Sequence, residues 1–132
     1  MPATLTTLSP DGQIAYAVIA NRAQRDPRVW TPEGTGPLPY AEVASLIQPF
    51  TPRRLSPPRF TAFHYILRDV AQYCCDRGLP PLTALVVNHH TWLPGRGWWG
   101  FVGEDLATLS PDAAHAIHAR YVREVLSQDW GW

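Results

Sequence analysis

The chain has 132 residues, of which 45% are hydrophobic and 17% charged, so it is long enough and apolar enough to bury one core. This composition argues against a disordered chain, and no apolar run approaches the ~18 residues of a transmembrane helix. Eleven arginines balance eleven acids, and this neutral charge argues against a strongly basic nucleic-acid-binding protein. We expect a single domain over residues 1–132. The first residues lack the basic start and apolar segment of a signal peptide, so we expect a cytoplasmic location and no membrane association.

A first helix is predicted over residues 9–24. Ser9 can cap its free N–H groups, Pro10 suits the first helical position, and Asp11 complements the helix dipole. The same Ser-Pro-Asp sequence recurs at residue 110 and predicts a last helix over residues 110–130.

Two further helices are predicted between these ends. Residues 25–37 are rich in Pro and Gly and form a loop, which a helix over residues 39–48 follows. Residues 49–59 hold four prolines and indicate a rigid connector. A third helix is predicted over residues 60–77, with Gly78 as its left-handed cap. Its apolar stripe, spaced by three and four residues, consists of Phe60, Phe63, Leu67, Val70 and Cys74.

Two short strands are predicted next. Residues 82–88 are apolar and β-branched, residues 98–102 are aromatic, and residues 89–97 hold Pro94, Gly95 and Gly97, which suit a hairpin loop. The expected fold is therefore α+β and mostly helical. It resembles a winged helix-turn-helix, with three helices, a β-hairpin wing and a C-terminal helix. Helix 60–77 would enter a major groove with His64, Arg68 and Gln72 facing outward.

Two segments carry a resemblance to a known family. Residues 39–44 read PYAEVA and residues 79–90 read LPPLTALVVNHH. They resemble the Thr-Tyr-Gly-Glu-Leu-Ala helix start and the strand ending in Pro-Cys-His-Arg of O6-alkylguanine-DNA alkyltransferases and alkyltransferase-like proteins. The resemblance covers roughly residues 38–102, requires an insertion, and implies a winged-helix fold with DNA binding. Asn88-His89 stands where that family has Cys-His, so methyl transfer is not predicted.

Four arginines in residues 53–68 are separated by no acid, whereas acids outnumber arginines after residue 104. Such a cluster is either a solvated surface or a site of phosphate contacts. The candidate nucleic-acid-binding residues are Arg53, Arg54, Arg59, His64, Arg68, Gln72 and Arg96.

The histidines suggest no strong catalytic or metal site. His89 and His90 are adjacent and would point to opposite faces of a strand. His115 and His118 are spaced i, i+3 on the last helix and could bind a metal with a nearby acid, although a lone His-x-x-His is weak. No nucleophile motif or glycine-rich phosphate loop is present. We therefore expect a non-enzymatic protein without cofactor or metal, and a metal-dependent enzyme using His115 and His118 ranks third.

The chain holds six tryptophans, and three of them lie in the predicted hairpin. Either the C-terminal tail folds back over an exposed one, or they form a partner surface. Trp92 and Trp99 are the candidate partner-binding residues. The sequence thus predicts a nucleic-acid-binding winged-helix protein of prokaryotic or mobile-element type that binds DNA. The alternative is a protein-interaction module, an inhibitor or adaptor, that uses a Trp-rich hairpin.

Overall fold

The computed structural model describes residues 7–25, 37–55 and 61–130. The described part is mostly helical with one small sheet, so the predicted α+β class is confirmed. None of its helices has the length and hydropathy needed to cross a membrane. The α-helices are α1 (Pro10–Arg25), α2 (Tyr40–Ile47), α3 (Thr61–Asp76), α4 (Arg96–Phe101) and α5 (Pro111–Ser127). Short 3-10 turns are η2 (Gln48–Phe50), η3 (Leu82–Leu85) and η4 (Leu106–Thr108).

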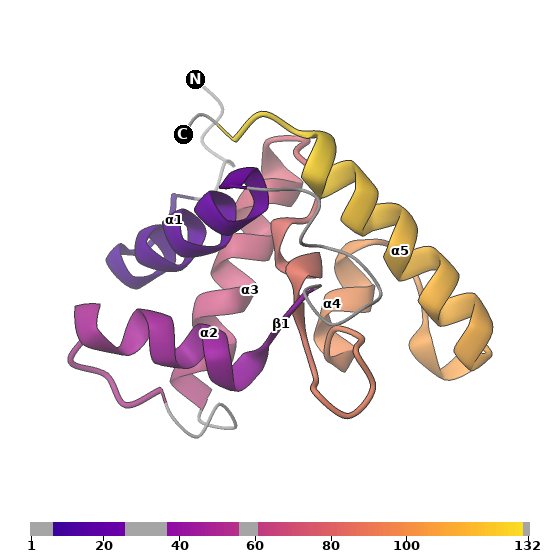
Figure 1. The fold of residues 1–132 in the computed structure, drawn as a ribbon, viewed down its shortest axis with the longest axis horizontal. Helices are drawn as coiled ribbons and strands as arrows, with labels where there is room; N and C mark the ends of the chain where they lie inside the picture. The colour runs from indigo at the N-terminus through magenta and orange to yellow at the C-terminus, as the bar shows by residue number, and fades with distance from the viewer. Residues whose placement is uncertain (1–6, 26–36, 56–60, 131–132) are drawn as a thin grey trace.

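Helix α3 lies in the middle of the molecule, with α1 and α2 on one side and α5 on the other (Figure 1). The predicted apolar stripe of α3 is confirmed for Phe63, Leu67, Val70 and Cys74, which are buried; Phe60 lies outside the described residues. The turn after α3 is also confirmed, because Gly78 has a φ of +68° and the Leu79 N–H donates to the Cys74 carbonyl at 2.9 Å.

Both predicted Ser-Pro-Asp caps are present. The Ser9 Oγ accepts from the Gly12 N–H at 3.1 Å, and the Ser110 Oγ accepts from the Ala113 N–H at 3.2 Å. Ser9 also donates from its backbone N–H and its hydroxyl to one carboxylate oxygen of Asp69, at 2.9 and 2.8 Å. Because Asp69 belongs to α3, this contact fixes the start of α1 against the central helix.

The predicted β-hairpin is wrong. The segment Arg96–Phe101 is helix α4, and β2 (Val86–Val87) pairs instead with β1 (Leu38–Pro39) in parallel, in the register Leu38 with Val86. The reason lies in the adjacent Trp98 and Trp99, which are 6% and 1% exposed. Neighbouring residues of a strand face opposite sides, whereas a helix turns about 100° per residue and lets both rings enter one core.

The C-terminal tryptophan that the structure describes does not cover the predicted hairpin. Trp130 is buried, donates its indole N–H to the Val125 carbonyl at 2.9 Å, and packs edge-on against Tyr16 of α1. The tail therefore covers the core on the side of α1. Trp98 is instead packed against His118 and Tyr121 of α5.

Candidate functional site

A cavity of about 1010 Å³ lies between α3 and α4 and extends to the start of α2 and the loop 88–95. Its size is at the upper end of the roughly 300–1,000 Å³ typical of small-molecule sites. The residues that line it are Tyr40, Ala41, His64, Leu67, Arg68, Ala71, Thr83, Val86, Asn88, His89, Gly95, Arg96, Gly97, Trp98, Gly100 and Phe101.

Small residues keep the cavity open. Gly97 and Gly100 are three residues apart on α4, so they lie on the same side of that helix, and both line the cavity. A Cβ added at either position would meet no other atom within 4 Å. Ala71 of α3 is also part of the lining. Larger side chains at Gly97 and Gly100 would have room to occupy this space, so the two glycines leave the α4 side of the cavity open.

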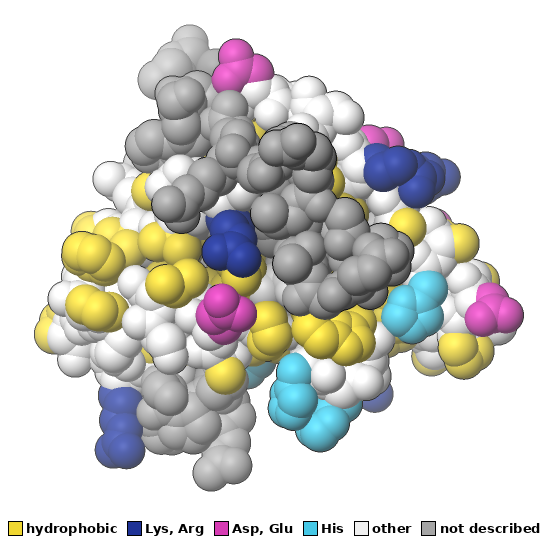
Figure 2. All heavy atoms as spheres, viewed as in Figure 1, with side chains coloured by type: hydrophobic (Ala, Val, Ile, Leu, Met, Phe, Trp, Pro, Cys, Tyr) yellow, Lys and Arg dark blue, Asp and Glu magenta, His cyan; other side chains and the backbone are white. Residues whose placement is uncertain are grey.

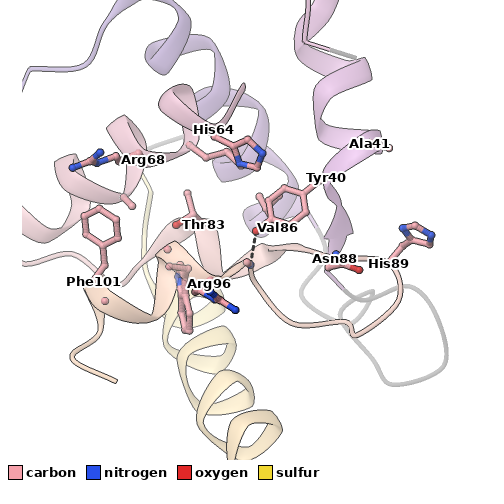
Figure 3. A pocket seen from close by; sticks show the side chains of 16 residues that line it. Tyr40, Ala41, His64, Arg68, Thr83, Val86, Asn88, His89, Arg96 and Phe101 are labelled. Carbon is pink, nitrogen blue, oxygen red and sulfur yellow. Dashed lines mark hydrogen bonds between the residues drawn. The ribbon is translucent and has the colours of Figure 1, made fainter. Parts of the chain in front are cut away.

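A contact between Tyr40 and Gly95 closes one end of the cavity. The backbone N–H of Gly95 donates to the Tyr40 hydroxyl (Figure 3), and a Cβ on Gly95 would lie 2.8 Å from that oxygen. Burial raises the pKa of the Tyr40 phenol, and the hydrogen bond from Gly95 lowers it by less. The phenol therefore stays protonated at neutral pH and keeps its own O–H for donation.

The charged groups at the cavity are all basic. Arg68 of α3 and Arg96 of α4 are exposed residues of the lining, and His64 lies beside Tyr40 with ring centroids 6.3 Å apart (Figure 3). No Asp or Glu occurs among the described residues that line the cavity. A pair of guanidinium groups over apolar walls, with no acid among the described lining residues, favours an anionic ligand with an apolar body.

Two buried polar atoms at the cavity have no hydrogen-bond partner within the described part of the chain. They are the Thr83 hydroxyl and the Trp98 indole N–H, on residues that are 5% and 6% exposed. Buried polar groups without partners are rare and often belong to a binding site. The donor-bearing side chains of the lining include Tyr40, Arg68 and Arg96, and they suit a ligand rich in acceptors.

Aromatic packing fixes Trp98 from behind. Its ring meets Trp99, His118 and Tyr121 edge-on, with centroids 4.9, 5.9 and 5.6 Å apart. The His118 Nε2–H donates to the Ala84 carbonyl at 2.7 Å, which joins α5 to η3. Because several rings hold the indole, this wall of the cavity is preorganised.

The structure brings three predicted nucleic-acid-binding residues to the cavity: His64, Arg68 and Arg96. Gln72 instead donates its side-chain amide to Asp76 at 2.8 Å. Arg53 lies 3.4 Å from Asp11 and is not among the lining residues, and neither is the exposed Arg54. Arg59 lies outside the described residues.

The two predicted partner-binding tryptophans differ. Trp99 is 1% exposed and donates its indole N–H to the Pro94 carbonyl at 3.2 Å, so its assignment to a partner surface is wrong. Trp92 is 45% exposed, in the loop 88–95.

The His115–His118 pair does not form a joint metal site in this structure. His115 is exposed, whereas His118 is buried and engages Ala84. Burial lowers the pKa of His118, the Ala84 hydrogen bond raises it by less, and nearby His115 lowers it further. No three His, Cys, Asp or Glu side chains gather at metal-binding distance in the ranges that the structure describes.

Sequence reasoning missed the cavity lining contributed by Tyr40, Thr83, Gly97, Trp98 and Gly100. The i, i+3 spacing of Gly97 and Gly100 was the available signal, because it places two residues without side chains on one helix face. Assigning residues 98–102 to a strand concealed that signal.

The chain shows no significant match to any protein-family model, curated protein sequence or solved structure.

Proposed function

We propose that this protein binds nucleic acid and that the cavity between α3 and α4 receives one nucleotide of the bound strand. The observation that supports this most is the composition of the cavity, in which Arg68 and Arg96 lie over apolar and aromatic walls and the described lining holds no acid. The arginines would contact phosphate, and the aromatic walls around Trp98 and Phe101 would take the base.

The shape of the site restricts the kind of nucleic acid. A pocket of about 1010 Å³ has the volume for a nucleotide but not for a stretch of duplex. The strand is therefore single, or the nucleotide has left the base stack, as in proteins that extrude a base. The donors at the cavity, among them the Tyr40 hydroxyl and the guanidinium groups of Arg68 and Arg96, match the acceptor atoms of bases and phosphates.

The winged-helix arrangement belongs to this proposal in a modified form. Helix α3 takes the place of the recognition helix, but α4 stands where a wing hairpin was predicted. The resemblance of residues 39–44 and 79–90 to alkyltransferase-like proteins implies the same class of ligand. The proposed role is binding alone, without chemistry on the nucleic acid.

The test is fluorescence anisotropy of a labelled single strand and the matching duplex, at about 50 and 200 mM salt. We expect the single strand to bind more tightly than the duplex, with an affinity that falls as salt rises. Absence of binding to both probes at the lower salt concentration would refute the proposal.

A protein-interaction module is the second candidate, and exposed apolar residues favour it. Leu46, Phe50 and Tyr65 are 44%, 65% and 60% exposed, around the end of α2 and the start of α3. Hydrophobic side chains also gather over α1 and α2 on the face shown in Figure 2. Under this function, Phe50→Ser with Tyr65→Ser would remove partner capture and leave nucleic-acid binding unchanged.

A further inference from the structure

Trp92 has a backbone conformation that a bulky side chain rarely adopts. Its φ is +57°, and no other non-glycine residue in the described ranges has a positive φ. The left-handed region is destabilising for any residue with a Cβ, so glycine is favoured there. Such strain persists only where the surrounding structure enforces it, and it concentrates at functional sites.

Hydrogen bonds within the loop 88–95 enforce this conformation. The Trp92 N–H donates to the Asn88 carbonyl at 2.7 Å, and the Asn88 N–H donates to the Leu93 carbonyl at 2.9 Å. The Asn88 side chain accepts from the His90 N–H at 2.8 Å. The loop is therefore closed by its own hydrogen bonds, which fix the backbone conformation at Trp92.

The Trp92 side chain is only partly covered by the fold. The residue is 45% exposed, and its ring stacks on no other aromatic ring among the described residues. A tryptophan that is strained, exposed and unstacked is better explained by a contact with a ligand than by packing.

The position of the loop 88–95 indicates which class of ligand Trp92 contacts. Asn88 and His89, from the same loop, line the cavity, and Arg96 follows directly after it. The loop projects at the lower edge of the molecule in Figure 1, where Figure 2 shows histidine side chains. An exposed aromatic ring beside a basic cavity is the arrangement that binds single-stranded nucleic acid, with bases stacked on the ring.

We propose that Trp92 is the stacking platform for a base that neighbours the nucleotide in the cavity. This inference rests on the proposed function. The closed loop fixes the backbone at Trp92 before binding, which reduces the entropy lost when the strand is bound. The test below also distinguishes the alternative in which Trp92 contacts a partner protein and not a nucleic-acid strand.

The test compares Trp92→Gly, Trp92→Phe and the parent protein. Binding is measured by anisotropy of a labelled, mixed-sequence single strand of about 12 nucleotides, and stability by thermal unfolding. Glycine relieves the strain and removes the ring, so we expect an unchanged or higher Tm together with binding weakened by about five- to 150-fold. Phenylalanine keeps a stacking face and should bind nearly as well as the parent. Phe50→Ala, which removes another exposed ring away from the cavity lining, is the matched control and should leave affinity unchanged.

Two results would overturn the stacking role of Trp92 while leaving the proposed function intact. One is parent-like affinity of Trp92→Gly while Arg68→Ala and Arg96→Ala weaken binding. The other is a Tm of Trp92→Gly well below the parent, which would make the ring a structural element. If the parent protein binds no strand, the proposed function fails and the stacking role fails with it. A partner protein that still requires Trp92 would then assign the ring to a protein surface.

Discussion

Two pairs of arginines in this molecule have different surroundings. Arg53 and Arg54 lie in the connector after η2, where the exposed Arg53 is 3.4 Å from the half-buried Asp11 in a surface ion pair. Arg68 and Arg96 come from two helices and border a cavity whose described lining holds no acid. A surface ion pair contributes little and is screened by salt, whereas charges over an apolar cavity can select a ligand. The lesson is that a cluster of arginines in the sequence is less informative than the surface on which the fold places each one.

The largest expected effect comes from filling the cavity while leaving both arginine pairs intact. Gly97→Leu places an isobutyl group where a Cβ meets no atom within 4 Å, and glycine is a poor helix former. We expect nucleic-acid binding to fall by at least about tenfold, a loss of about 1.4 kcal/mol. Unfolding should occur at the parent temperature or above it.

Ala116→Leu, at an exposed position of α5, is the control for Gly97→Leu and should leave binding unchanged. Parent-like binding by Gly97→Leu would show that the strand does not enter the cavity.

A second effect, on stability and not on binding, is expected from overpacking the contact between Gly95 and Tyr40. Gly95→Ala brings a Cβ to 2.8 Å from the Tyr40 hydroxyl, so overpacking should lower the free energy of unfolding by about 1–3 kcal/mol. In a Tyr40→Phe background Gly95→Ala should lower the free energy of unfolding by less, because the hydroxyl oxygen that the new Cβ would meet is absent. Urea unfolding of the four proteins in this double-mutant cycle measures the coupling. Equal losses in both backgrounds would contradict the close contact.

The smallest effect is a pH dependence at His118, behind the cavity wall. Burial lowers the pKa of His118 below its ordinary value of 6.5, so the unfolded chain takes up this proton more readily. The free energy of unfolding should therefore be highest above pH 6.5 and fall as pH drops from there toward the folded-state pKa. The slope contributed by this residue is at most about 1.4 kcal/mol per pH unit.

Urea unfolding between pH 7.5 and 5, at about half-unit steps, would resolve this slope as a difference between the parent and His118→Gln. Identical pH profiles of the two proteins would contradict the assignment to His118.

The sequence predicted the helices well and the cavity poorly, for physical reasons. Local chemistry defines the Ser9 and Ser110 caps and the turn at Gly78, so these were predictable. The strand assigned to residues 98–102 failed because Trp98 and Trp99 enter one core from a helix, and the burial of Trp98 depends on rings of α5. The cavity requires α4 to lie opposite α3, a tertiary relation that no local pattern contains. His64, Arg68 and Arg96 were predicted as individual residues, without their common site.

The most direct test compares two double variants in the same salt titration of a labelled single strand. Arg68→Ala with Arg96→Ala should weaken binding and flatten the slope of log affinity against log salt by about 1.4, since each phosphate contact on a single strand contributes about 0.7. Arg53→Ala with Arg54→Ala should leave both affinity and slope near the parent values. The opposite pattern would be loss of binding in Arg53→Ala with Arg54→Ala and parent-like binding in Arg68→Ala with Arg96→Ala. That result would contradict the assignment of the ligand to the cavity between α3 and α4.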